Sequence, residues 1–178
     1  MNGQVEDSIL VRAAQNGDID AFEELVRRYQ TSIYRVALRM LGSRADAQDA
    51  VQDTFVRAWR ALPRFRHDSA VSTWLYRIVT RRALDKIASR RTTGTLDEVD
   101  LGGGPDPVQA AEHQERFRAV RQAIAKLPPE QRAALVLREF EGLSYQEVAH
   151  VLGASVPAIK TRIHRARLTI IQQTSSWQ

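Results

Sequence analysis

Apolar residues recur at spacings of three and four along almost the whole chain, and this period constrains the fold more than any other feature. Strand signals are nearly missing, because apolar and polar residues do not alternate over any long run and no Asn-Gly or Asp-Gly pair joins two strand-like runs. The sequence therefore predicts an all-α protein. The expected helices cover about 7–15, 18–41, 44–61, 70–90, 110–126, 129–140, 144–152 and 155–173.

Local signals mark where several of these helices begin. Asp18 and Ser43 can act as N-caps, because a short side-chain oxygen accepts a backbone N–H that has no partner in the first turn. The run SYQE, residues 144–147, is a capping box, in which Ser144 and Glu147 satisfy each other's backbone donors.

The segment 92–110 interrupts the helical pattern. It contains four of the nine glycines, two prolines and four acidic residues, and no lysine or arginine. We therefore predict a flexible acidic linker between two small helical domains, residues 1–91 and 111–178. A segment of this length can reach roughly 60 Å when it is extended.

The composition excludes several classes of function. Without cysteine the chain can hold neither a disulfide nor cysteine-ligated zinc, and its four histidines lack the spacing of metal ligands, so we expect no metal and no cofactor. No nucleophile or acid/base pair converges, so we expect no enzymatic activity. No apolar run approaches the roughly 18 residues of a membrane span, and the N-terminus lacks a signal-peptide layout. We expect a cytoplasmic protein without membrane insertion. The net charge of +5 and the pI of about 10.1 favour a polyanionic partner.

The second domain ends in a pattern typical of a helix-turn-helix. A short helix over SYQEVAHVL is joined by GAS to a longer one that begins with SVPAIKTRIHRARL, residues 155–168. No acidic residue follows Glu147, and an ordinary solvated helix would interleave acids with its bases. We predict that the longer helix reads duplex DNA in the major groove, with a solvated or protein-binding helix as the alternative. At 100° per residue its buried stripe comprises Val156, Ile159, Ile163, Ala166 and Ile170, and the opposite side Ala158, Thr161, Arg162 and Arg165.

The helix expected over 44–61 has an acidic face. Asp46, Asp49, Gln52 and Asp53 share one side of it, and the other side is apolar. From these residues alone we favour a solvated surface with an Asp53–Arg57 ion pair over a partner-binding patch.

The segment 64–91 mixes aromatic and basic residues. Phe65, Trp74 and Tyr76 stand among many arginines and only two aspartates. This mixture favours single-stranded nucleic acid, because bases stack on aromatic rings while cations hold the phosphate backbone. The alternative is that Trp74 belongs to the core, and in either case we expect at least one of the three aromatic residues to be buried.

Three motifs follow one another along the chain: DAQDAVQDTFVRAWRALPRFR, then STWLYRIVTRRALDKIASRR, then LPPEQRAALVLREFEGLSYQEVAHVLGASVPAIKTRIHRAR. They resemble region 2.2, regions 2.3 and 2.4, and region 4 of bacterial sigma factors of the extracytoplasmic-function (ECF) group of the sigma-70 family. Those factors consist of the second and fourth sigma domains joined by a linker. The resemblance implies a promoter-specificity subunit that binds core RNA polymerase, recognises promoter DNA and initiates transcription of a specific regulon. It also implies an anti-sigma factor as a partner.

The resemblance further implies roles for individual residues. On the acidic face, Asp49, Gln52 and Asp53 would dock on the clamp helices of the largest polymerase subunit. Recognition of the minus-ten element and capture of its single strand would involve Ser69, Ala70, Trp74, Tyr76, Arg77 and Arg81. The helix that reads the minus-thirty-five element in duplex DNA would use Lys160, Thr161, Arg162, His164 and Arg165.

The chain departs from the family pattern at two positions. Arg81 stands where the family commonly has Asn, and Pro157 where relatives usually carry Gly. Two other classes stay open: a regulator with a similar helix-turn-helix and an N-terminal sensing or dimerising domain, and a helical adaptor that meets no DNA. The run TWLYRI separates them from a sigma factor, because a sensor domain has no use for it.

Overall fold

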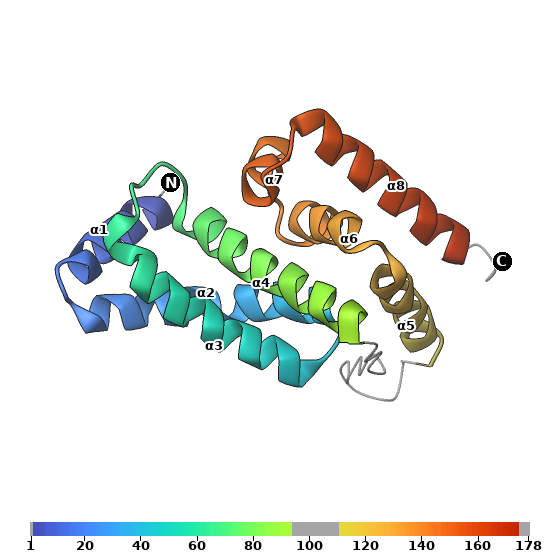
Figure 1. Ribbon diagram of the computed structural model, residues 1–178, viewed down its shortest axis with the longest axis horizontal. Coiled ribbons are helices and arrows are strands. Elements are labelled where there is room, and N and C mark those ends of the chain that lie inside the picture. The colour runs from blue at the N-terminus through green and yellow to red at the C-terminus, as the bar shows by residue number, and fades with distance from the viewer. Residues whose placement is uncertain (1, 94–110, 175–178) are drawn as a thin grey trace.

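The apolar period of three to four residues forms helices throughout the part of the chain that the computed structural model describes, residues 2–93 and 111–174. The all-α prediction is confirmed. The N-terminal half comprises α1 (Asn2–Gln15), α2 (Ile19–Leu41), α3 (Arg44–Ala61), the 3-10 turn η1 (Leu62–Arg64) and α4 (Val71–Thr93). The C-terminal half comprises α5 (Ala111–Lys126), α6 (Pro129–Leu135), the π turn η2 (Val136–Phe140), α7 (Tyr145–Leu152) and α8 (Val156–Thr174) (Figure 1).

The predicted capping signals are present at the helix starts. Asp18 Oδ1 accepts a hydrogen bond from the backbone N–H of Ala21 at 3.1 Å, and Ser43 caps α3 in the same way. Both bonds of the capping box between Ser144 and Glu147 are formed. Residues near these helix starts therefore have partners for backbone donors that the helix itself leaves free.

Three boundaries differ from the prediction. α1 begins at Asn2 rather than near residue 7, and α4 continues to Thr93, two residues into the expected linker. The helix expected over 129–140 changes from α to π after Leu135, and its last turn closes with a bond from the N–H of Glu141 to the carbonyl of Val136 at 3.3 Å. The rest of the expected linker, 94–110, lies outside the described residues.

Each half buries the apolar faces of its helices against one another. In the N-terminal half α2 packs on α1, α3 and α4, and in the C-terminal half α8 packs on α5, α6 and α7. None of the helices within residues 2–93 and 111–174 is long and apolar enough to cross a membrane.

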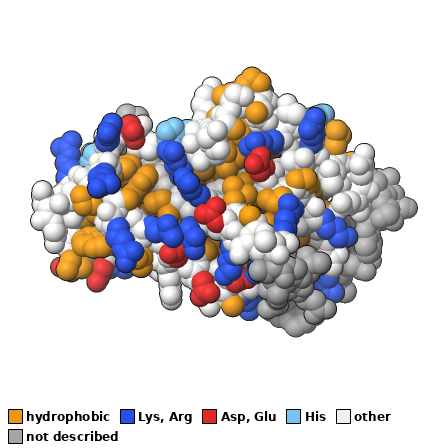
Figure 2. Space-filling model, in the orientation of Figure 1, with side chains coloured by type: hydrophobic (Ala, Val, Ile, Leu, Met, Phe, Trp, Pro, Cys, Tyr) orange, Lys and Arg blue, Asp and Glu red, His pale blue; other side chains and the backbone are white. Residues whose placement is uncertain are grey.

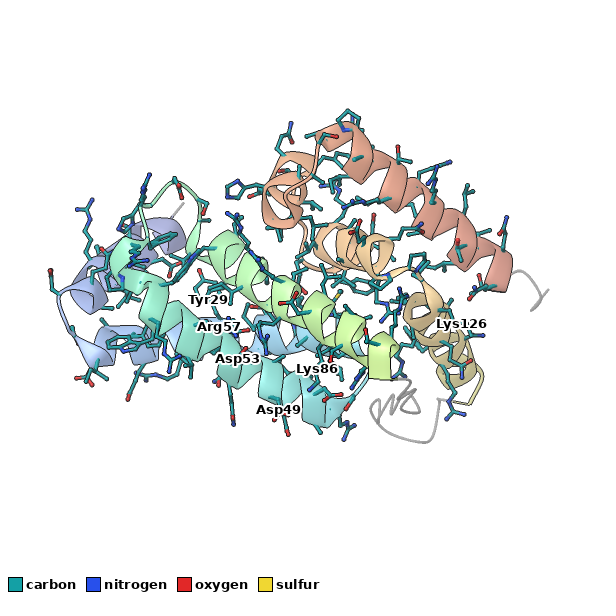
Figure 3. All side chains as sticks on the ribbon, viewed as in Figure 1. Tyr29, Asp49, Asp53, Arg57, Lys86 and Lys126 are labelled. Atoms are coloured by element: carbon teal, nitrogen blue, oxygen red, sulfur yellow. The ribbon has the colours of Figure 1, made fainter. Side chains whose placement is uncertain are left out.

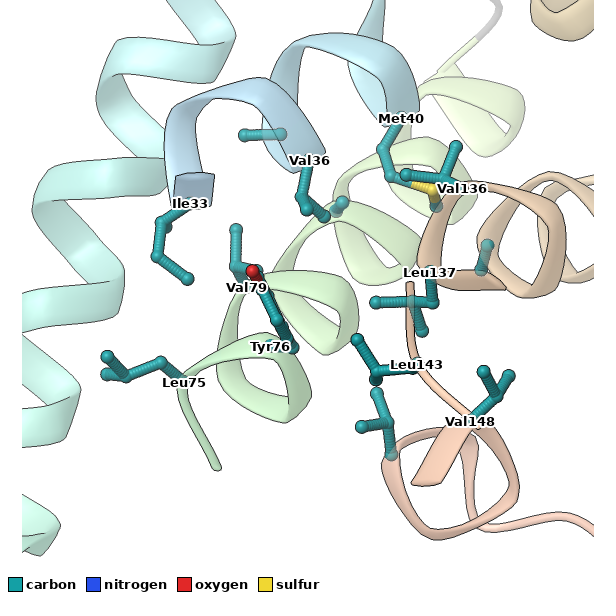
Figure 4. Packing of buried hydrophobic residues seen from close by; sticks show 14 of the residues in the cluster. Ile33, Val36, Met40, Leu75, Tyr76, Val79, Val136, Leu137, Leu143 and Val148 are labelled. Carbon is teal, nitrogen blue, oxygen red and sulfur yellow. The ribbon is translucent and has the colours of Figure 1, made fainter. Parts of the chain in front are cut away.

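One continuous apolar cluster joins the two halves. α4 contacts α6 and α7, and α2 contacts α5, α6 and η2. The two-domain prediction from the sequence did not include this packing. In the close view of Figure 4, Met40 of α2 lies beside Val136 and Tyr76 of α4 faces Leu143 of the C-terminal half, while Ile33 and Leu75 lie farther from that half.

Candidate nucleic-acid and partner interfaces

The helix-turn-helix forms as the sequence predicts, from α7, a three-residue turn and α8. Gly153 ends α7 in the left-handed conformation, with φ of 60°, which a residue with a side chain rarely adopts. The N–H of Ala154 bonds to the carbonyl of Ala149 at 3.0 Å, and Ser155 Oγ accepts from the N–H of Ala158 at 3.3 Å. The turn thus fixes the direction in which α8 leaves α7.

The buried stripe of α8 is confirmed at its centre. Ile159, Ile163 and Ala166 are buried, whereas Val156 and Ile170 at the ends of the stripe are half-buried. Because the stripe faces α5, α6 and α7, the opposite side of α8 is open to solvent. We call its exposed polar residues the recognition surface: Lys160, Thr161, His164 and Arg165.

Arg162 lies at the edge of this surface rather than in its middle, so the prediction that it faces away from the stripe is wrong. Its side chain is half-buried and its Nη2 lies 2.5 Å from Glu130 Oε2 of α6. Arg167 likewise pairs with Glu139. The acids that are missing from α8 are thus supplied by a neighbouring element, because α6 and η2 run beside it.

The acidic face of α3 is only partly free. Asp49 is 75% exposed, with Lys86 Nζ 3.9 Å away, whereas Asp46 is largely covered and pairs with Lys86 and Arg90 of α4. Asp53 forms the predicted pair with Arg57 at 2.9 Å. Asp49 and Asp53 lie one turn apart on α3, and Lys86 lies near them (Figure 3).

Arg82 of α4 also pairs with Asp53. We call Asp49, Gln52 and Asp53 the acidic patch. Its most accessible groups are the Asp49 carboxylate and the exposed Gln52 amide.

Two exposed apolar residues adjoin the acidic patch and were not singled out as site residues from the sequence. Val56 is 47% exposed and Trp59 is 39% exposed, and they lie about one and two turns beyond Asp53 on α3. The Trp59 ring packs against Phe22 of α2, with centroids 4.9 Å apart, which holds its orientation. A valine among polar residues on the outer face was the only signal in the sequence. Large apolar groups beside charges are typical of protein-binding surfaces.

An open hollow lies where the chain enters α4. Its volume is about 240 Å³, and His67 at its rim has a left-handed backbone, with φ of 58°. The Trp74 ring is half-buried and packs on Phe65 at 4.7 Å between centroids. The lining residues are Asp7, Ser8, Phe65, His67, Ser69, Ala70 and Val71.

A buried carboxylate supports this hollow from α1. Asp7 accepts a hydrogen bond from the Tyr29 hydroxyl and lies 3.2 Å from Arg28 Nη1. Burial, followed by the bond to Asp7, raises the pKa of Tyr29, so this phenol stays protonated as the donor. The network ties α1 to α2, and no sequence pattern predicts it because its members lie more than 20 residues apart in the chain.

The predicted minus-ten residues do not all share one surface. Ser69 and Ala70 line the hollow, and Arg77 and Arg81 are exposed on α4. Several lysine and arginine side chains are spread among apolar ones over the N-terminal half on the face seen in Figure 2. Tyr76, by contrast, is buried against the C-terminal half, and burial raises its pKa to about 12. With Phe65 also buried, the expectation of at least one buried aromatic residue is confirmed.

Two family models match the chain, one in each half. Sigma-70 region 2 matches residues 25–93, and Sigma-70, region 4 matches residues 117–170. The first range runs from within α2 to the end of α4, and the second from α5 into α8.

Curated relatives match over nearly the full length. The RNA polymerase sigma-H factor of Pseudomonas aeruginosa is 38% identical over 179 residues, which cover 94% of this chain and 93% of the relative. The ECF RNA polymerase sigma-E factor of Escherichia coli strain K12 is 36% identical over 182 residues, which cover 96% of this chain and 95% of the relative.

Solved structures share the fold. CnrH in complex with the cytosolic domain of CnrY aligns with a TM-score of 0.73 and 30% identity, over 96% of this chain and 98% of that one. The sigma factor RpoE in complex with the anti-sigma factor NepR from Bartonella quintana also has a TM-score of 0.73, over 88% of this chain and 98% of that one. At 23% identity this second likeness concerns the fold alone.

Proposed function

Because the chain belongs to the extracytoplasmic-function group of the sigma-70 family, we propose that it is a promoter-specificity subunit that binds core RNA polymerase, recognises promoter DNA and initiates transcription of a specific regulon. The observation that carries the proposal is the recognition surface. It is basic and exposed, and it lies on the second helix of a helix-turn-helix within the region 4 match.

For the minus-thirty-five element, the recognition surface supplies both kinds of contact that duplex DNA needs. Lys160 and Arg165 are exposed cations that can bind phosphates or guanine edges, and Thr161 and His164 are polar groups on the same side. Arg162 can join them only by leaving Glu130, so we assign it a smaller part.

Lys160→Ala is expected to weaken binding of duplex promoter DNA and to reduce the salt dependence of that binding. Log K falls linearly with log salt concentration, and removal of one cation near a phosphate makes this slope shallower by about 1. Fluorescence anisotropy over a series of salt concentrations measures both quantities, with Gln172→Ala, an exposed change further along α8, as control. An unchanged slope would remove Lys160 from the contacts with DNA.

For the minus-ten element, we assign the hollow and the exposed side of α4 to single-stranded DNA. Ser69 and Ala70 at the hollow can contact an extruded base, and Trp74 offers a half-exposed ring for stacking. We assign the exposed side chains of Arg77 and Arg81 to phosphates of the same strand. Tyr76 belongs to this set by sequence, but its hydroxyl is occupied by Glu141.

For core polymerase, we assign the acidic patch and extend it by Val56 and Trp59. Carboxylates give an oriented attraction to basic residues on a partner helix, and the apolar pair gives area that can be buried. The clamp helices of the largest subunit are the proposed partner, and an anti-sigma factor is a second proposed partner of the chain.

The proposed function also implies that the chain has no catalytic chemistry of its own and where in the cell it works. We propose that the chain acts by binding alone, is not an enzyme by itself, needs no cofactor, and works in the cytoplasm, where its DNA and polymerase are. The competing classes, a sensor with a helix-turn-helix and an adaptor that meets no DNA, account for the recognition surface or the helical fold, but neither accounts for a region 2 match.

Run-off transcription tests the function directly. Core RNA polymerase with genomic DNA should give promoter-dependent transcripts when the chain is added and none of these transcripts without it. Core that neither retains the chain nor initiates with it would overturn the proposal in favour of a sensor-type regulator.

A further inference from the structure

The first two turns of α8 carry a strip of apolar surface on their solvent side. Pro157 and Thr161 are both exposed, and they lie one turn apart and about 40° from each other around the helix axis. The hydroxyl of Thr161 donates a hydrogen bond to the carbonyl of Pro157 at 3.0 Å. Because this bond engages the hydroxyl hydrogen, the Thr161 methyl group and the Pro157 ring form the outer surface here. We call these two groups the Pro157–Thr161 strip.

The other polar side chains of these two turns have partners beside the strip. Ser155 Oγ accepts a hydrogen bond from a backbone N–H of its own helix at 3.3 Å. Arg162 Nη2 lies 2.5 Å from Glu130 Oε2 of α6. Lys160 Nζ lies 5.6 Å from the centroid of the Tyr145 ring on α7. Side-chain donors that could meet a base edge therefore lie on the flanks of the strip and not on the strip itself.

The Tyr145 ring holds Lys160 on the flank that faces α7. The Arg138 guanidinium lies over the same ring, 4.6 Å from its centroid, and its Nη1 donates to the Leu143 carbonyl at 2.7 Å. The negative face of an aromatic ring attracts a cation, so Lys160 is drawn toward α7. Since the first helix of a helix-turn-helix crosses the DNA backbone, a phosphate is the partner of Lys160 on this flank.

The strip complements one feature of the major groove. The second helix of a helix-turn-helix places its N-terminal residues against base edges, and there thymine alone among the four bases presents a methyl group. Proline also lacks a backbone N–H, so Pro157 offers a base no donor from its main chain. Apolar surface laid over a base donor or acceptor would leave that group without a partner, which has a free-energy cost, whereas the same surface can bury a methyl group.

We propose that the Pro157–Thr161 strip sets the specificity of minus-thirty-five recognition by selecting thymine through its 5-methyl group. This assignment rests on the proposed function, because it gives a base to the helix that is proposed to read duplex DNA. Residues four apart lie about 6 Å from each other along a helix, and base pairs stack about every 3.4 Å. The selected thymines are therefore expected about two base pairs apart, on either strand.

Replacement of single thymines by uracil tests the strip. The full chain, both free and bound to core RNA polymerase, first selects duplexes from a random DNA library. Each thymine of the selected sequence is then replaced by deoxyuridine, which removes only the methyl group. Loss of one buried methyl group should raise the Kd about 3- to 5-fold at one or two positions and leave it unchanged elsewhere, as measured by fluorescence anisotropy. Failure of both forms to select a sequence, or a Kd that no uracil changes, overturns the proposal.

Two substitutions at Thr161 separate its methyl group from its hydroxyl. Thr161→Ser removes the methyl group and keeps the bond to Pro157, so the ratio of the Kd for uracil to the Kd for thymine should fall to about 1 at one position. Thr161→Val keeps a methyl group at this place without the hydroxyl and should retain the 3- to 5-fold ratio. A variant that is merely destabilised changes both Kd values equally and leaves the ratio unaltered. The reverse result, with Thr161→Ser discriminating and Thr161→Val not, would overturn readout by the methyl group.

Pro157→Ala and a matched threonine complete the series. Pro157→Ala truncates the ring and should lower the ratio at the second position. Thr169→Ser is the control, because the Thr169 hydroxyl donates to the Arg165 carbonyl at 3.0 Å, as Thr161 does to Pro157, but lies two turns further along α8. It should leave the ratio unchanged at every position. Equal effects of Thr169→Ser and Thr161→Ser would show that the strip does not select the base.

Run-off transcription decides the proposed function separately. A chain that initiates promoter-dependent transcripts but binds uracil and thymine duplexes equally keeps the proposed function and loses the thymine assignment. A chain that discriminates uracil from thymine but neither binds core nor initiates loses the proposed function, while the strip stays a reader of duplex DNA.

Discussion

Replacement of both Asp49 and Asp53 by lysine is expected to abolish binding to core RNA polymerase. The double change converts two negative charges of the acidic patch into two positive ones, which would repel a basic partner surface. We expect the Kd to rise at least about 100-fold, the range seen when charged pairs at an interface are lost. Titration of labelled chain with core measures the Kd, and circular dichroism should show unchanged helix content.

A control with the same change of net charge at another site distinguishes an effect of the acidic patch from an effect of the overall charge. Asp20→Lys with Glu23→Lys alters two exposed acids on α2 and should leave the Kd nearly unchanged. Asp49→Lys alone adds a test free of structural loss, because Asp53 also holds Arg57 whereas Asp49 is largely solvated. If the α2 control weakens binding as much as the patch variant does, the assigned docking site is wrong.

Ile163→Ala is expected to lower the free energy of unfolding by about 2–5 kcal/mol, since it leaves a cavity beneath α8. Ile163 is 1% exposed and packs among the helices of the C-terminal half. The adjacent His164 is exposed, so His164→Ala should change the free energy of unfolding by no more than about 0.5 kcal/mol. Urea unfolding followed by circular dichroism measures both.

The same pair should behave in the opposite way toward DNA. His164→Ala is expected to weaken duplex promoter binding, and Ile163→Ala should leave binding intact at temperatures where the protein remains folded. A destabilised His164 variant, or an Ile163 variant of normal stability, would contradict the orientation of α8.

The sequence predicted what local physics decides. The boundaries of α2 and α3 follow from period and from caps at Asp18 and Ser43, and the centre of the α8 stripe follows from period alone. The position of Arg162 was predicted wrongly because this residue lies between the buried and the exposed sides of α8. At such a position the exposure of a side chain depends on which residues the neighbouring helix places beside it. Glu130 of α6 is that neighbour, and its position is set by tertiary packing.

Ion pairs and hydrogen bonds between distant parts of the chain could not be predicted for the same reason. Asp46 lies on the acidic face of α3 in the sequence pattern, but its carboxylate forms ion pairs with Lys86 and Arg90 of α4. Tyr76 and Glu141 are 65 residues apart and meet only because the halves pack. Periodicity indicates which side of a helix is apolar, but it carries no information on which other helix covers that side.

The π turn at Val136–Phe140 sets how the two halves mesh. It holds one more residue than an α-turn, and on its two sides Glu139 bonds to α8 while Glu141 bonds to α4. Deletion of Phe140 would leave Glu139 and Glu141 adjacent and only about 100° apart around the axis, so the two carboxylates could not reach α8 and α4 at the same time. The single extra residue of this turn therefore sets how the helix-turn-helix lies against α4 of the N-terminal half.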